Sequence, residues 1–105
     1  MTDTPAPFAD PALVGAMMAA SPDLLFFKDA TFVYRYVNRA FCDLFDLPVP
    51  AIVGRTDFEI FPTESAERHR RADLSVMASG RFAAFEYEVV HGGRAVWLQV
   101  LKSPV

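Results

Sequence analysis

The spacing of apolar residues in the first third of the chain predicts a short helix followed by a β-hairpin. Pro11 suits the first turn of a helix over residues 11–20, and Asp10 is its candidate N-cap. A continuous apolar run over 23–28 is typical of a strand that is buried on both faces. The run over 32–37 alternates, and three residues separate the two runs, which favours an antiparallel hairpin. One face of the second strand would carry Phe32, Tyr34 and Tyr36, and the other Val33, Arg35 and Val37.

Residues 38–62 predict a helix and then several short helical turns. Asn38 follows the second strand and is a candidate N-cap. The inward stripe of the helix would consist of Phe41, Leu44 and Phe45. After two prolines, Thr56 and Glu59 have the S/T-x-x-E spacing of a capping box.

The longest predicted helix covers residues 64–79. Thr63 is its candidate N-cap, and Gly80 is suited to end it in a left-handed conformation. Its best apolar line consists of Ala66, Leu74 and Met77, with Arg70 in the gap.

Two β-rich runs, 82–90 and 95–102, flank the pair Gly92-Gly93, which is a strong signal for a second hairpin. With both glycines at the centre of the turn, Val89 lies opposite Val96, Tyr87 opposite Leu98 and Phe85 opposite Val100. We expect the apolar face to lie against the helices; it carries Phe85, Val89, Val96, Leu98 and Val100. The opposite face is mixed, with Glu86, Glu88, Trp97, Gln99 and Leu101.

Charge and composition argue against several classes of binding partner. The net charge is −3, and the nearest approach to a basic patch, Arg68, Arg70 and Arg71, is interleaved with Glu64, Glu67 and Asp73, as on a solvated helix face. No apolar run approaches the ~20 residues that span a bilayer. The N-terminus lacks the positive region of a secretory signal, and the single Cys42 excludes an internal disulfide. We therefore expect a cytoplasmic protein that binds neither nucleic acid nor membrane.

The order of these elements, together with six short motifs, resembles the PAS family. The resemblance covers about residues 12–105 and implies an α+β fold, in which short helices cover one face of a five-stranded antiparallel sheet and enclose a small cavity. An N-terminal helix precedes the sheet. The motifs are Phe27-Lys28-Asp29, Val37-Asn38-x-x-Phe41, Ile52-Val53-Gly54-Arg55, Asp57-x-x-Ile60-Phe61-Pro62, Ser79-Gly80, and Trp97 with Lys102-Ser103-Pro104.

Family members continue past the last of these motifs into a fifth strand in the middle of the sheet. The sequence ends at Val105, so we expect a PAS domain over 11–105 that lacks its C-terminal strand. Residues 1–10 are expected to form a flexible leader. The gap would be closed by direct pairing of the first and fourth strands, by the leader segment 2–8, or by a strand from a second subunit.

The resemblance implies a sensor that binds a small molecule in its cavity and regulates a downstream effector, such as a histidine kinase of a two-component system or a nucleotide cyclase. The alternative is a ligand-free module for dimerisation and protein interaction. No residue pattern suggests a catalytic site, so we do not expect an enzyme. The candidate cavity residues are Phe26, Tyr34, Tyr36, Phe41, Phe45, Phe58, Arg70, Leu74, Met77, Leu98 and Val100.

Two subclasses of the family bind a cofactor through particular residues, and the sequence can be checked for those residues. Flavin photoreceptors resemble one another in a cysteine on the helix after the Ile-x-Gly turn, and here that helix (GRTDFEIFP) has none. Cys42 lies one helix earlier and is interpreted as a packing residue. Haem sensors carry an axial His on the long helix, where His69 lies, but the Arg that contacts bound gas is missing from the next strand. We therefore expect neither flavin photochemistry nor a metal site, with haem ligation by His69 as a minor alternative and a solvent-facing side chain as the simpler expectation.

The N-terminal helix has an apolar stripe without polar compensation, which indicates an interface. In the family, such a helix often packs on the outer face of the sheet of its own or of a partner subunit. We expect a homodimer whose interface includes Leu13, Val14, Met17, Met18, Trp97 and Leu101.

Overall fold

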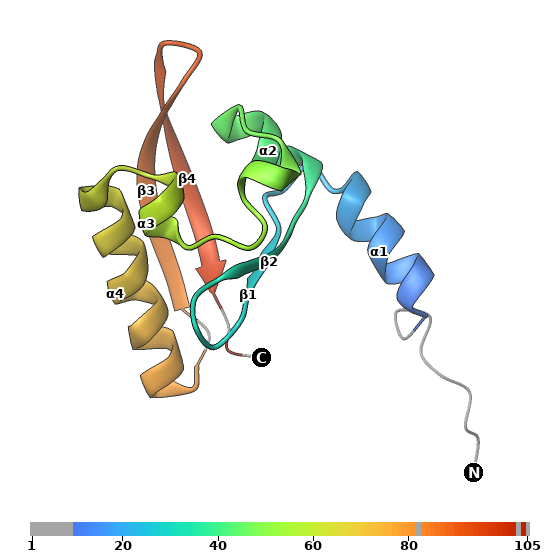
Figure 1. Cartoon of the computed structure of the whole chain (residues 1–105), viewed down its shortest axis with the longest axis horizontal. Helices are drawn as coiled ribbons and strands as arrows, with labels where there is room; N and C mark the ends of the chain where they lie inside the picture. The colour runs from blue at the N-terminus through green and yellow to red at the C-terminus, as the bar shows by residue number, and fades with distance from the viewer. Residues whose placement is uncertain (1–9, 82, 103, 105) are drawn as a thin grey trace.

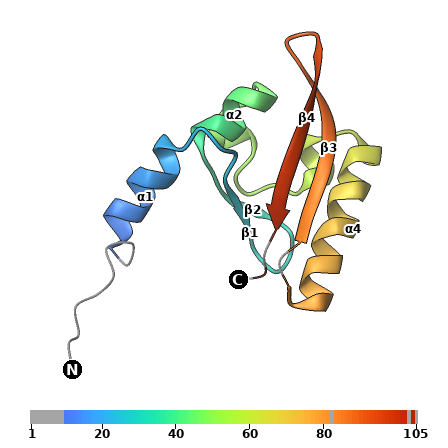
Figure 2. The same ribbon diagram turned by 180° about the vertical axis from the view of Figure 1, so that it is seen from behind.

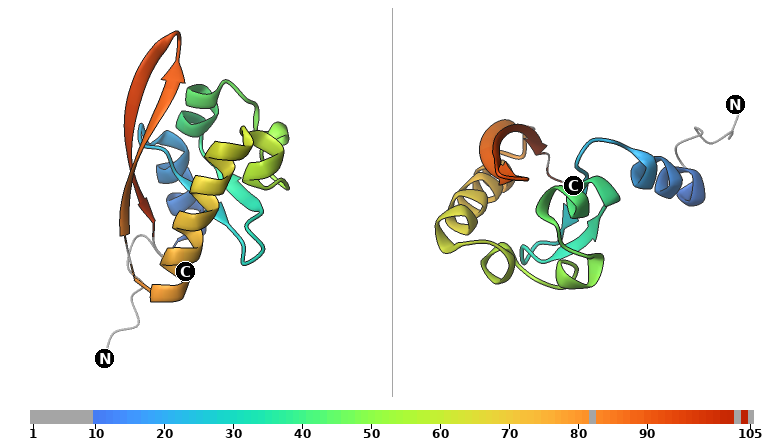
Figure 3. Two further views of the ribbon diagram at one scale, coloured as in Figure 1. Left: turned by 90° about the vertical axis from the view of Figure 1, so that its left-hand side faces the viewer. Right: turned by 90° about the horizontal axis from the view of Figure 1, so that it is seen from above.

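The computed structural model describes residues 10–81, 83–102 and 104, and it has the helix and strand order that the sequence predicts (Figure 1). The elements are α1 (Pro11–Ala20), β1 (Phe26–Lys28), β2 (Tyr34–Val37), α2 (Arg39–Phe45), the 3₁₀ turn η2 (Val49–Ala51), α3 (Asp57–Ile60), α4 (Thr63–Ser79), β3 (Ala83–His91) and β4 (Arg94–Lys102). Helices α2, α3 and α4 all lie on one side of the β3–β4 hairpin (Figure 3, left). This is the expected α+β arrangement.

Helix α1 begins as predicted and then lies apart from the rest of the fold. Asp10 caps it, since its Oδ1 accepts a hydrogen bond from the backbone N–H of Ala12 at 3.0 Å. The helix lies beyond the β1–β2 hairpin, at the opposite end of the molecule from α4 (Figures 1 and 2). It therefore does not pack against the β3–β4 hairpin of its own chain. Leu13, Met17 and Trp97 all stay exposed.

The β1–β2 hairpin is antiparallel, as predicted, but its register contains an irregularity. Phe27 pairs with Tyr36 and Lys28 with Tyr34, so Arg35 is left over on the second strand. Because one extra residue reverses the alternation of side chains, Tyr34 and Val37 are both buried, although the simple period placed them on opposite faces. Phe27 is exposed, so the first strand is not buried on both faces.

A cluster of aromatic rings forms the centre of the core beside this hairpin. Tyr34, Val37, Phe41 and Ile52 are buried there. The Phe41 ring makes edge-to-face contacts with Phe26 and Tyr34, with centroids 5.9 and 5.6 Å apart, and a tilted contact with Phe45 at 4.9 Å. Cys42 packs against the same cluster, as expected for a packing residue, and burial raises the pKa of its thiol.

Asn38 does more than cap α2. Its Oδ1 accepts from the N–H of Phe41, as predicted, and also from the N–H of Leu25. Its amide group donates to the carbonyl of Asp23 at 2.7 Å and to that of Met18 at 3.2 Å. One buried side chain therefore joins the end of α1, the start of β1 and the start of α2.

Helix α4 is rotated relative to the prediction. Its buried residues are Ala66, Ala72, Asp73 and Val76, whereas Leu74 and Met77 are half exposed, so the predicted apolar line is confirmed at Ala66 and wrong at Leu74 and Met77. Thr63 is also not the N-cap but the first helical residue, and Pro62 precedes it. Gly80 ends the helix with a φ of +65°, as expected for a left-handed terminal residue.

The β3–β4 hairpin has the predicted register, with Val89 opposite Val96, Tyr87 opposite Leu98 and Phe85 opposite Val100. The predicted inward residues are partly buried, and Glu86, Glu88 and Trp97 are exposed on the other face. The choice of turn is therefore confirmed. The side chains of Gln99 and Leu101 lie outside the described residues.

The two hairpins form separate two-stranded sheets in the described part of the chain, not one continuous five-stranded sheet. Strands β1 and β4 do not pair, so direct pairing of these two strands is not how the structure is arranged. The leader segment 2–8 lies outside the described residues. That a strand of a second subunit closes the gap left by the missing fifth strand stays a prediction.

Candidate functional site

A cleft of about 910 Å³ lies between the two hairpins and extends to α2 and α4. Residues of β1 and β4 line it from both sides, and the aromatic core forms part of its wall. The predicted cavity residues that line it are Phe26, Tyr34, Phe41, Phe45, Met77, Leu98 and Val100. Tyr36, Phe58, Arg70 and Leu74 are not among its lining residues.

Arg70 has a different environment from the one that we expected. Its guanidinium lies 4.3 Å from the ring centroid of Phe32 and 5.1 Å from that of Phe58. These are cation–π distances, and they hold the side chain against two rings that connect α4 to the β1–β2 turn and to α3. Arg70 therefore links helices and a turn instead of providing a polar point in the cleft.

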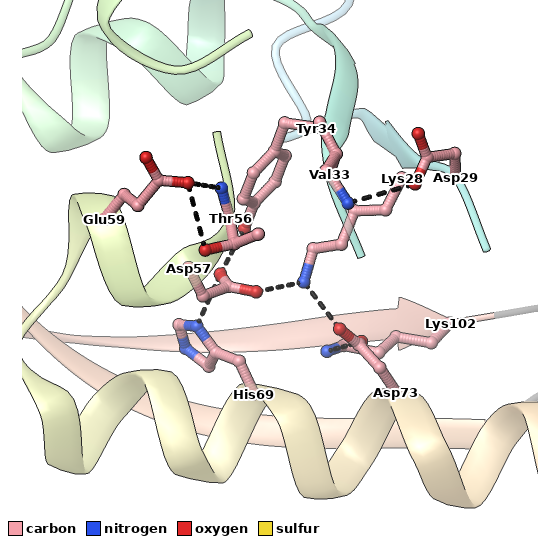
Figure 4. A network of polar contacts seen from close by, with 10 residues as sticks. All are labelled: Lys28, Asp29, Val33, Tyr34, Thr56, Asp57, Glu59, His69, Asp73 and Lys102. Atoms are coloured by element: carbon pink, nitrogen blue, oxygen red, sulfur yellow. Dashed lines mark hydrogen bonds and ion pairs between the residues drawn. The ribbon is translucent and has the colours of Figure 1, made fainter. Parts of the chain in front are cut away.

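The polar part of the cleft is a buried network of two lysines and two aspartates (Figure 4). Lys28 Nζ donates to Asp57 Oδ2 at 2.5 Å and to Asp73 Oδ2 at 2.6 Å. Lys102 Nζ donates to the other oxygen of Asp73, also at 2.6 Å. All four side chains are at most 10% exposed. The network joins the end of β1, the end of β4, α3 and α4 at one place.

Asp57 collects further hydrogen bonds. Its Oδ1 accepts from the hydroxyl of Tyr34 at 2.6 Å and lies 3.2 Å from Nδ1 of His69. Burial by itself would raise the pKa of Asp57, but the hydrogen bond with His69 and the charge of Lys28 together hold it well below its ordinary value. Burial, followed by the charge of Asp57, raises the pKa of Tyr34, so this phenol stays protonated and donates.

His69 is not the solvent-facing residue that its charged neighbours suggested. Its side chain is only 16% exposed, and its ring lies edge-on between Phe61 and Tyr87, with centroids 5.3 and 4.9 Å away. The reason is helical geometry: α4 turns Arg68 and Arg71 outward while Ala66, His69 and Asp73 share its inward face.

The sequence did not identify the network as a site. Asp73 was assigned to a solvated helix face, and this is wrong, because Lys28 and Lys102 pair with it in the interior. A signal was present nonetheless: Ala66, His69, Asp73 and Val76 follow the i, i+3, i+7, i+10 spacing of one helix stripe. The polar residues in that stripe needed partners from elsewhere in the chain.

The stability of the domain is expected to decrease when the pH falls below about 4. The pKa of Asp57 is lower in the folded state than the ordinary value of 3.8. Its charged form therefore contributes stability that is complete above pH 3.8 and is lost as the pH falls toward the lowered value. Urea denaturation between pH 7 and pH 3 measures this, and Asp57→Asn should flatten the acid limb. An equally steep acid limb in the variant would contradict the assignment.

The described residues contain no group of three or more His, Cys, Asp or Glu side chains suited to a metal ion. In the same part of the chain, none of the helices combines the length and the apolar character that crossing a membrane requires.

Comparisons with known proteins agree with this architecture. A family model described as the PAS fold matches residues 18–105. An uncharacterised protein of Sinorhizobium fredii, y4lL, is 33% identical over 89 residues; the match covers 84% of this chain and 11% of that protein. The PAS domain of BvgS from Bordetella pertussis superposes with a TM-score of 0.74 at 19% identity, over 90% of this chain and 72% of that one. An RNA-binding light-oxygen-voltage receptor superposes with a TM-score of 0.70 at 22% identity, over the whole chain and 31% of the receptor.

Proposed function

Because the chain belongs to the PAS family of sensory and signalling domains, we propose that it binds a small molecule in the cleft between its hairpins and passes the resulting conformational bias to an effector in the same protein. A histidine kinase or a nucleotide cyclase is the class of effector that we expect. A PAS domain is itself a non-catalytic module, so any catalytic activity belongs to the effector. The cytoplasm is the proposed compartment.

The observation that carries this proposal is that the cleft borders the charged network. Lys28, Asp73 and Lys102 line the cleft, and they also tie β1 and β4 to the long helix. A ligand that contacts these groups changes the interactions that position both hairpins. A ligand shifts an equilibrium only by its difference in affinity for the two states, and this network is where such a difference can arise.

The proposed ligand binding is tested by native mass spectrometry and an absorption spectrum of the purified domain, followed by thermal unfolding across a panel of metabolites. We expect either a co-purifying mass or a rise in melting temperature with a subset of the panel, because a ligand that binds only the folded state stabilises it. A visible haem or flavin band would instead support a cofactor. A colourless protein without added mass, whose melting temperature no compound changes, would favour the ligand-free interaction module.

The same mass spectra report the oligomeric state. We propose a homodimer, supported by the exposed apolar side chains of Leu13 and Met17 on α1 and of Trp97 on β4. In this arrangement, α1 would cover the outer face of the partner's hairpin, because it leaves its own uncovered (Figures 1 and 2). A spectrum that contains only monomer at high concentration would contradict the homodimer.

A further inference from the structure

The donors on the floor of the cleft outnumber the acceptors that they meet. An ammonium group carries three N–H donors. Hydrogen bonds within the described part of the chain use two of these on Lys28 and one on Lys102. Three N–H groups therefore have no hydrogen-bond acceptor among the described residues.

Tyr87 adds a hydroxyl to the same floor. Its oxygen is buried, and no group of the described residues forms a hydrogen bond with it. Lys102 Nζ lies 5.6 Å from the ring centroid of Tyr87, so the hydroxyl and the ammonium groups belong to one region of the cleft. An unpaired hydroxyl in a buried position is unfavourable unless something occupies the place of its partner.

From these donors we propose that the cleft binds a small carboxylic acid with an apolar body, whose carboxylate accepts hydrogen bonds from Lys28, Lys102 and Tyr87. This inference rests on the proposed small-molecule function and specifies its ligand class. A carboxylate offers about four lone-pair positions on two oxygens, which matches the remaining donors, and bonds from ammonium groups to a carboxylate are charge-assisted. The apolar body would lie against the aromatic and aliphatic wall that Phe26, Leu98 and Val100 provide.

The charged groups of the site balance one another before a ligand binds. Lys28 and Lys102 are balanced by Asp57 and Asp73, so a bound carboxylate adds one negative charge. His69 adjoins the same groups. Its ring faces Asp57 of α3 and Tyr87 of β3, and Lys28 of β1 bonds to the same Asp57. An amine ligand would instead bring a third ammonium group beside Lys28 and Lys102.

The test compares matched acids and amides on the domain and two tyrosine variants. The probes are benzoate, phenylacetate and hexanoate, each paired with its neutral amide, and binding is measured by isothermal titration calorimetry. We expect each acid to bind more tightly than its amide. Tyr87→Phe should not lower the melting temperature of the unliganded domain, since its hydroxyl has no partner among the described residues, and it should weaken acid binding by about 10-fold. Tyr36→Phe, outside the cleft lining, is the matched control and should change neither quantity.

The outcomes separate this inference from the proposed function. Amides that bind as tightly as the acids would overturn the carboxylate assignment and leave ligand binding in the cleft intact. Acids that bind with equal affinity to the wild type and to Tyr87→Phe would show that the hydroxyl is not part of the site. If no acid of the panel binds, the inference is wrong, and the metabolite screen then decides by itself whether the cleft binds ligands at all.

Discussion

Replacing Asp73 with asparagine is expected to lower the free energy of unfolding by about 3–5 kcal/mol. The variant keeps the shape of the side chain, removes its charge and replaces one of the two acceptor oxygens with an NH₂ donor. Asp73 accepts from both Lys28 and Lys102, each at 2.6 Å. Without it, two buried ammonium groups lie close together with a single carboxylate, Asp57, bonded to one of them. Chemical denaturation monitored by circular dichroism measures the loss.

Asp43→Asn is the matched control for this substitution. Asp43 makes an exposed ion pair with Arg39 at 3.6 Å, and an exposed pair contributes about 0–1 kcal/mol. If the Asp73 and Asp43 variants lose the same small amount, the network does not stabilise the folded state.

Phe41→Ala is expected to destabilise the domain by about 3–5 kcal/mol. Phe41 is 3% exposed, and its ring contacts the rings of Phe26, Tyr34 and Phe45. Removing it leaves a cavity that three rigid aromatic neighbours cannot fill, so the lost transfer free energy is accompanied by lost packing. The midpoint of urea denaturation reports the change, provided that the slope of the transition stays the same.

Phe27→Ala controls for the loss of an aromatic ring as such. Phe27 adjoins Phe26 in β1, but its side chain is 40% exposed, so the same truncation removes much less buried surface. We expect a loss well below that of Phe41→Ala. Equal losses at both positions would mean that the ring cluster around Phe41 is not the centre of the core.

The helix ends and the hairpin turn were predictable from the local sequence pattern to within a few residues. Asp10 and Asn38 cap their helices, Gly80 ends the long helix, and Gly92-Gly93 sets the register of the last hairpin. Each of these features depends on neighbours in the chain: a side-chain oxygen and an N–H two or three residues away, or a φ value that glycine adopts readily. The resemblance to the PAS family rested on the order of the elements together with six short motifs.

The site was not predictable in this way. Lys28, Asp57, Asp73 and Lys102 lie far apart in the chain, and a charged residue by itself is expected to face water. The sequence therefore placed Asp73 and His69 on a solvated face, and it named Tyr36, Phe58, Arg70 and Leu74 as cavity residues by their type alone. The rotation of α4 turned His69 and Asp73 inward and left Leu74 half exposed.

By itself, the sequence determined the order of the elements, the N-caps of α1 and α2, the turn of the last hairpin and the family to which the chain belongs. Only the tertiary structure decided which side of the long helix is buried, that Arg35 interrupts the alternation of β2, and that the two hairpins remain separate around a cleft. The physical reason is the range of the interactions. Hydrogen bonds and backbone conformations within a turn are encoded by adjacent residues, whereas a buried ion pair becomes favourable only when the fold brings its partners together.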